Sequence, residues 1–170
     1  MPMSIETDLS QIEGLFDELE GSVGKAAAHG LYKGAGVVAD ALTAAIKSIK
    51  TEPFHYVREG EPKRLPSPQE VAALGHGQFG VAKFRGSGSE IQTSVGFGDA
   101  GYAHIMGSGK DESKVTPVPE IAYSINSGTS FMQKQPFLRK AYNVSKGRAD
   151  YIIASTIEAE LQSAIDAHNT

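Results

Sequence analysis

The N-terminal part of the chain carries apolar residues at the spacing of amphipathic helices. Between residues 8 and 23 these positions are Leu9, Ile12, Leu15, Phe16, Leu19 and Val23. An alanine-rich stretch, residues 25–49, continues the spacing, and its small side chains would let a neighbouring element approach closely. We therefore expect two helices, kinked or separated at residues 21–24, with the second weakened by about 1 kcal/mol at each of Gly34 and Gly36.

The next part of the chain is interrupted by prolines. Residues 52–66 contain three prolines and mixed charges, which predicts an exposed loop. Ser67-Pro-Gln-Glu70 has the sequence of a capping box, with serine as the N-cap and proline at the first helical position. This box predicts a short helix that runs through Leu74 and ends at Gly75 or Gly77.

Short strands are expected in the glycine-rich middle of the chain. Two apolar runs, residues 79–84 and 91–97, flank Gly86-Ser-Gly-Ser and predict a β-hairpin. The polar stretch 98–120 predicts a second exposed loop, within which Tyr102-Ala-His-Ile is compatible with the start of a strand.

A further strand is predicted just before a glycine turn. Ile121, Tyr123 and Ile125 alternate with smaller or polar residues, which is the period of a half-buried strand over residues 121–127. Gly128, within a Ser-Gly-Thr-Ser cluster, is expected to end this strand.

The C-terminal segment predicts a long helix. Pro136 suits its first turn, and apolar residues recur near one face as far as about Ala167. The order of elements is then helices, a glycine-rich antiparallel sheet and a long helix, which indicates the α+β class. We expect one domain over residues 1–170, with a small antiparallel sheet of about three to five strands and exposed loops near 52–66 and 98–120.

Composition narrows the possible functions. The chain of 170 residues has a formal net charge of −4, which argues against a nucleic-acid binder that works through a basic surface. It contains no cysteine, so disulfides, thiolate zinc sites and cysteine nucleophiles are excluded. The acidic N-terminus lacks the features of a signal peptide, and no apolar run approaches the roughly 20 residues that span a bilayer. We therefore expect synthesis and folding in the cytoplasm, without a membrane partner.

Three patterns resemble sites for small-molecule chemistry, and we interpret each as structural. Gly75-His-Gly-Gln-Phe-Gly80 matches a dinucleotide fingerprint, but the predicted helix precedes it and the predicted strand follows it, the reverse of that motif's context. The histidines are scattered without the spacing of a zinc site. Ser127-Gly-Thr-Ser130 lacks the residues that surround a hydrolase nucleophile, and its hydroxyls are expected to bond nearby backbone. We predict no catalytic residues, no metal site and no cofactor.

Basic residues gather around the start of the C-terminal helix: Lys134, Arg139, Lys140, Lys146 and Arg148. One interpretation is contact with an acidic surface on a neighbouring subunit, and the other is a solvated helix face. Cations near a helix N-terminus oppose the helix dipole, which slightly favours an external anionic partner.

Two segments carry a resemblance to a known family. Ser127-Gly-Thr and Gln135-Pro-Phe-Leu-Arg-Lys-Ala141 closely resemble tailed-bacteriophage proteins that act as tail-completion or head–tail joining (neck) components, minor tail components of phages and prophages of Gram-positive hosts. Residues 74–85 and 93–98 look like the middle of the same family, and the resemblance extends from about Gly34 onward.

The resemblance implies a non-enzymatic structural protein of the virion neck, where head meets tail, with a tail-terminator-like fold. It implies a ring, expected to be a hexamer, between the tail tube or tail terminator protein and a head-closure, adaptor or collar protein, with DNA passing through the lumen without specific binding. The candidate interface residues that match the family's motif are Ser127, Gly128, Thr129, Pro136, Phe137, Arg139 and Lys140. The alternatives are a tail terminator that caps the tube, a small serine hydrolase that uses the Ser-Gly-Thr turn, and a cytosolic ligand-binding domain.

Overall fold

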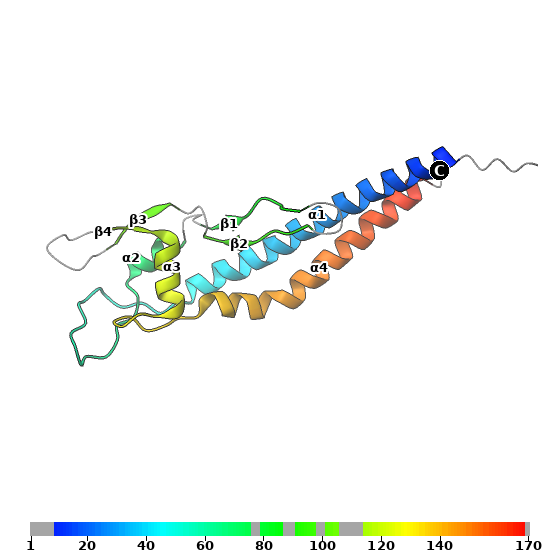
Figure 1. Ribbon diagram of the computed structural model, residues 1–170. Coiled ribbons are helices and arrows are strands. Elements are labelled where there is room, and N and C mark those ends of the chain that lie inside the picture. Colours follow the sequence, from blue (N-terminus) through cyan, green and yellow to red (C-terminus); the bar gives the residue numbers. More distant parts are fainter. Residues whose placement is uncertain (1–8, 76–78, 87–90, 98–100, 106–113, 169–170) are drawn as a thin grey trace, which may run out of the picture.

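The structure, a computed structural model, describes residues 9–75, 79–86, 91–97, 101–105 and 114–168 (Figure 1). In this part of the chain two helices come first, four short strands follow, and two further helices come last. In order they are α1 (Leu9–Lys47), α2 (Pro68–Ala72), β1 (Gly80–Val81), β2 (Val95–Gly96), β3 (Tyr102–Ile105), β4 (Lys114–Pro117), α3 (Val118–Ser127) and α4 (Phe137–His168). The fold is α+β, as predicted, with a long helix at each end.

The two long helices, α1 and α4, lie side by side and antiparallel, and together they form a helical hairpin (Figure 1). The first turns of α1 and the last turns of α4 lie at one end of the hairpin, which we call the tip. The opposite end, where α1 finishes and α4 begins, is the base. Gly30 and Gly34 of α1 are buried against α4, so the small residues of α1 face the partner helix as the sequence predicted.

The predicted break at residues 21–24 is wrong, because α1 is continuous over 39 residues. Glycine lowers helix propensity by about 1 kcal/mol but, unlike proline, it removes no backbone donor and introduces no clash. Packing along α4 therefore offsets the local cost, and the two predicted helices are one.

The four strands form two antiparallel ribbons of two strands each instead of one sheet. In the first ribbon Val81 pairs with Val95, and a bridge between Arg85 and Gln92 extends the pairing, which confirms the predicted hairpin. Its loop, residues 87–90, lies outside the described residues. This ribbon lies against α1 (Figure 1).

The second ribbon and α3 correct two sequence predictions. Residues 102–105 and 114–117 are paired strands where most of 98–120 was predicted as a loop; residues 98–100 and 106–113 lie outside the described part. Residues 121–127 belong to helix α3, so the predicted strand is wrong.

Residues 121–127 form a helix and not a strand because the buried residues of α3 have helical spacing. Val118, Ile121, Ala122 and Ile125 are all buried, at intervals of three and four, whereas Tyr123 is 70% exposed. A strand would have placed Tyr123 on the same face as Ile121. Proline in the first turn of α3 further favours a helix, and Gly128 ends the element as predicted, although that element is a helix.

The core lies at the base of the hairpin, where α1, α3 and α4 meet the ribbons. Phe97 is buried there, with its ring edge-on to Phe79 and to Phe137, at centroid distances of 5.5 and 6.2 Å. Further buried residues of this core are Leu42, Ile46, Leu74, Val118, Ile125 and Met132. None of the described helices has the length and apolar character needed to cross a membrane.

Candidate functional site

The predicted motif residues form the corner between α3 and α4, at the base of the hairpin. Ser127 is the exposed last residue of α3, and Gly128 follows with φ 77° and ψ 168°, a conformation essentially restricted to glycine. A Cβ atom on Gly128 would lie 3.0 Å from the backbone nitrogen of Lys134 and 3.1 Å from the carbonyl oxygen of Met132. Gly128 therefore permits the corner to close.

Thr129 fixes the turn that follows. Its backbone N–H donates to the Met132 carbonyl at 3.0 Å, and its hydroxyl oxygen accepts from the N–H groups of Met132 at 3.0 Å and Phe131 at 3.3 Å. These bonds confirm the expectation that a hydroxyl of the Ser-Gly-Thr-Ser cluster bonds nearby backbone. The role of Thr129 is to shape the corner.

Two hydrogen bonds hold the start of α4 to α3. The N–H of Gln135 donates to the Ile125 carbonyl at 2.7 Å, and the N–H of Leu138 donates to the side-chain oxygen of Asn126 at 3.2 Å. The second bond satisfies one of the free donors of a helix N-terminus. Pro136 immediately precedes α4 and is exposed, whereas Phe137 is buried in the core.

A buried ion pair joins the 52–66 loop to α2. The Arg64 guanidinium donates two hydrogen bonds to the Glu70 carboxylate, at 2.8 and 2.7 Å, and both side chains are almost fully buried. The backbone of Arg64 also bridges to the corner, with its N–H donating to Phe131 and its carbonyl accepting from Gln133. The Arg64 charge lies 4.8 Å from the centre of the Phe54 ring, within cation–π range. Arg64 therefore links the loop, α2 and the α3–α4 corner, through its side chain to α2 and through its backbone to the corner.

The protonation of Glu70 depends on these partners. Burial opposes its ionisation, but hydrogen bonds from Arg64 and from the Ser67 backbone, together with the Arg64 charge, hold the pKa of Glu70 below its ordinary value of 4.5. Glu70 also completes the predicted capping box, which the structure confirms: Ser67 is the N-cap and its oxygen accepts from the Glu70 N–H. The sequence identified Glu70 as a cap residue and missed its pairing with Arg64.

The exposed surface of α4 carries the remaining motif residues. Arg139 and Lys140 are both exposed, and the Lys140 ammonium donates to the hydroxyl of Ser48 at 2.8 Å. Farther along the helix, Val144 and Tyr151 are 74% and 72% exposed, apolar side chains that α1 does not cover. This face therefore combines basic groups with uncovered apolar surface.

The two ends of the hairpin differ in charge. A Cβ atom on Gly30 would lie 3.0 Å from the carbonyl oxygen of Ile153 and 3.0 Å from Cγ1 of Ile157. Residue 30 of α1 is therefore level with the middle of that stretch of α4, at about residue 155. Between that level and the tip, the side chains that the structure describes on α1 and α4 include one lysine and three acidic residues: Glu158, Glu160 and Asp166. Between that level and the base the two helices contain two acidic residues and six basic ones: Lys33, Lys47, Arg139, Lys140, Lys146 and Arg148.

This charge distribution does not stabilise α4 itself. Its four basic residues lie in its N-terminal half and three of its four acidic residues in its C-terminal half, and both arrangements oppose the helix dipole. The pair formed by His29 and Glu160 is one contact between the helices near the tip, and both side chains are substantially exposed. The basic end and the acidic end are thus complementary to each other but cannot meet within one molecule.

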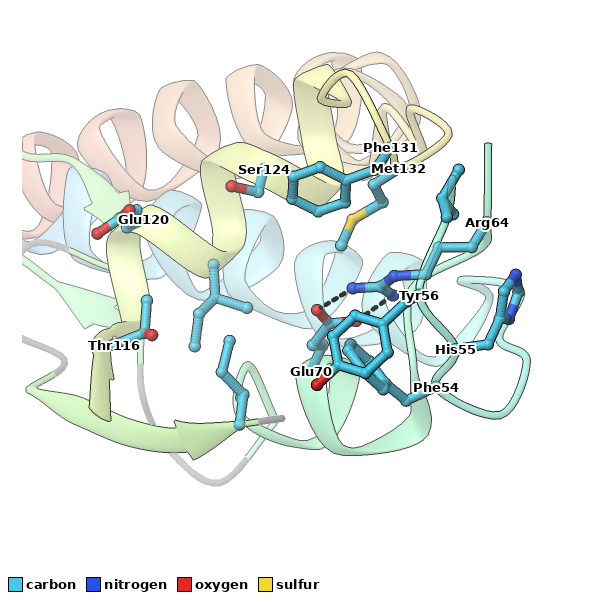
Figure 2. A pocket seen from close by; sticks show the side chains of 13 residues that line it. Phe54, His55, Tyr56, Arg64, Glu70, Thr116, Glu120, Ser124, Phe131 and Met132 are labelled. Carbon is cyan, nitrogen blue, oxygen red and sulfur yellow. Dashed lines mark hydrogen bonds and ion pairs between the residues drawn. The ribbon is translucent and has the colours of Figure 1, made fainter. Parts of the chain in front are cut away.

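A pocket of about 290 Å³ opens beside the corner, between residues 54–57, the second ribbon, α3 and residues 131–132 (Figure 2). The Arg64–Glu70 pair forms one wall, and Thr116 and Glu120 stand across the pocket from it. The sequence did not predict this pocket, because its walls come from four segments far apart in the chain.

The structure gives the positions of several of the histidines, and of the described part of the glycine motif, that were considered from the sequence. His29 pairs with Glu160, His55 contacts the Pro53 carbonyl, and neither histidine bonds Ser127. Among the described residues no group of three or more histidine, cysteine or acidic side chains is placed to hold a metal ion. The glycine motif at residues 75–80 is preceded by α2 and followed by β1, the order expected for a structural role, and residues 76–78 lie outside the described part.

Comparison of the chain with family models, with curated proteins and with solved structures finds no match in any of the three.

Proposed function

We propose that this chain is a structural protein of the neck of a tailed bacteriophage, which assembles as a ring between the head-closure protein and the tail tube. The observation that carries the proposal is the opposite charge of the two ends of the α1/α4 hairpin. The resemblance of residues 127–141 to tail-completion proteins is the reason for proposing a phage neck as the place of assembly.

Opposite charges on two distant surfaces suit a head-to-tail contact between copies. The acidic tip of one copy would approach the basic base of the next, which is a heterologous interface, and such interfaces form rings when the rotation closes. Arg139 and Lys140 would take part directly, while Val144 and Tyr151 would add apolar surface. A hexamer matches the symmetry expected of a tail tube.

The remaining motif residues would act by shaping this surface. Gly128 and Thr129 hold the corner, Phe137 anchors α4 in the core, and Arg64 fixes the neighbouring loop. Because α4 is fixed at its first turn, the basic side chains are presented on a rigid element. The exposed loop 52–66 is the proposed contact with the adjoining tail or head protein, and the tail terminator is the alternative place for the ring.

A charge exchange in a phage that encodes this chain tests the proposal. We expect deletion of the gene to yield filled heads and separate tails, and the wild-type gene to restore joined, infectious particles. Arg139→Glu with Arg148→Glu should fail to restore joining, and adding Glu158→Lys with Asp166→Lys should recover it, because the contact between the base and the tip is then re-formed with reversed signs. Lys83→Glu with Arg85→Glu, on the first ribbon, makes the same change in net charge and should complement fully.

Particles that join normally without the gene would contradict the neck role. If the Arg139/Arg148 variant complemented as well as the Lys83/Arg85 variant, the role could stand but the charged ends would not be its interface. Electron microscopy of the particles separates these outcomes, since it distinguishes unjoined tails from complete virions. A tail terminator would instead be revealed by tails of abnormal length.

A further inference from the structure

The pocket beside the α3–α4 corner has the size of a site for one ring-bearing group. Its volume of about 290 Å³ is at the lower end of small-molecule sites, which start at about 300 Å³. Ile105, Ile121 and Met132 provide aliphatic walls, and the rings of Tyr56 and Phe131, about half exposed, stand at the rim. These surfaces favour an apolar, flat occupant.

The wall of the pocket across from Arg64 carries a buried hydroxyl that has no partner in the described part of the chain. Thr116 is 6% exposed, and its hydroxyl oxygen has no hydrogen-bond partner among the described residues. Thr116 pairs with Ala103 across the second ribbon and shares the inner face of that ribbon with Ile105. In Figure 2 its hydroxyl lies on the side that faces the pocket. A hydrocarbon occupant would leave this group unsatisfied, whereas a hydroxyl-bearing one would pair with it.

The charges around the pocket favour a neutral occupant. The guanidinium of Arg64 and the carboxylate of Glu70 satisfy each other through two hydrogen bonds, so neither requires a counter-ion. Glu120, on the opposite wall, is exposed and would repel an anion. An amine is less well matched, because the buried polar atom that lacks a partner is a hydroxyl, whereas the carboxylate of Glu120 is exposed to solvent.

We infer that this pocket binds a neutral phenol-like group, with its ring between the aliphatic and aromatic walls and its hydroxyl paired with Thr116. The same chemistry could be presented by a tyrosine side chain of a neighbouring protein in an assembly or by a free phenolic molecule. The inference does not depend on the neck role, because it rests on the pocket alone.

The first test uses two probes, p-cresol and toluene, which differ by one hydroxyl. In the full chain with labelled isoleucine and methionine methyl groups, p-cresol should shift the NMR signals of Ile105, Ile121 and Met132 and leave Ile165, at the tip, unchanged. The wild-type chain should bind p-cresol about 3- to 10-fold more tightly than toluene, the effect of one hydrogen bond. Thr116→Val should abolish that preference and still bind toluene.

Retention of the preference in Thr116→Val, or methyl shifts that spread beyond the pocket, would overturn the inference. A second variant tests the location of the site independently of Thr116. Ser124→Phe places a ring in the pocket from α3 and should abolish binding of both probes. Tyr123→Phe, on the outward face of the same helix, is its matched control and should bind like wild type.

Assembly assays distinguish the two possible sources of the phenol group, a tyrosine of a neighbouring protein and a free phenolic molecule. If the occupant is a tyrosine of a neighbouring protein, Ser124→Phe should weaken attachment to purified tails or to other copies, and Tyr123→Phe should not. If the occupant is a free molecule, both variants should assemble alike while only Ser124→Phe fails to bind p-cresol. Failure of the neck role would leave the p-cresol result unaffected.

Discussion

Gly34 of α1 lies directly against the side chain of Ile153 of α4. A Cβ atom at residue 34 would stand 2.5 Å from Cγ1 and 2.7 Å from Cδ1 of Ile153, closer than side-chain atoms can approach. The close approach of the two helices therefore depends on the absence of a side chain at this position. Gly36, two residues later, has no atom within 4 Å of the corresponding position.

Alanine substitution at these two glycines should have opposite effects. Gly34→Ala should lower the free energy of unfolding by about 1–3 kcal/mol, because α4 must shift or Ile153 must leave its rotamer. Gly36→Ala should raise it by about 0.5–1 kcal/mol, because alanine favours the helix and meets no neighbour. Urea denaturation followed by circular dichroism measures both. Equal changes at the two positions would show that helix propensity alone controls them.

The conformation of Gly128 gives a second prediction. Gly128→Ala should destabilise the chain by about 1–3 kcal/mol, since alanine is strained in this backbone conformation and its Cβ would contact the backbone at Lys134 and Met132. Gly147, exposed in α4 with nothing within 4 Å of a Cβ, is the matched control. Gly147→Ala should stabilise by about 0.5–1 kcal/mol in the same urea experiment. A neutral Gly128→Ala would mean that the corner has another low-energy shape.

The sequence predicted those parts of the fold that local signals determine. The capping box at Ser67, the hairpin around β1 and β2, and the proline-led start of α4 all follow from residues within a few positions of one another. The segment 121–127 was wrongly predicted as a strand, because Ile121 and Ile125 satisfy both a strand and a helix period. The burial of Val118 and Ala122, together with the exposure of Tyr123, resolves it in favour of a helix.

The candidate site was less predictable because its contacts are long-range. The turn chemistry of Gly128 and Thr129 was anticipated from their residue types, and the basic residues of α4 were noted as a group. Neither the pocket nor the complementary charge of the hairpin ends could be derived, since both depend on how α1 and α4 are paired. The pairing of Arg64 with Glu70 also required the three-dimensional course of the 52–66 loop.

Breaking the Arg64–Glu70 pair on one side should be costly. Arg64→Met leaves the Glu70 carboxylate buried without its guanidinium partner and should lower the free energy of unfolding by about 3–5 kcal/mol. Arg64→Met combined with Glu70→Gln removes both charges, so it should recover a large part of that loss. A double variant as unstable as Arg64→Met would indicate that the loss came from the packing of Arg64 against Phe54 instead of from the charge.

The same pair predicts a specific acid sensitivity. Because the pKa of Glu70 is lowered in the folded chain, its stabilising contribution is fully present above the ordinary value of 4.5. That contribution should be lost as the pH falls from about 4.5 through the lowered pKa, where the folded chain must take up a proton that the unfolded chain already carries.

The free energy of unfolding, measured by urea denaturation between neutral pH and about pH 3, should therefore fall more steeply for wild type than for Glu70→Gln. Glu120→Gln, which removes an exposed carboxylate, is the control and should follow the wild-type curve. Parallel curves for wild type and Glu70→Gln would show that the carboxylate of Glu70 gains no stability from its buried partners, because a group with equal pKa values in the folded and unfolded chain contributes no pH dependence.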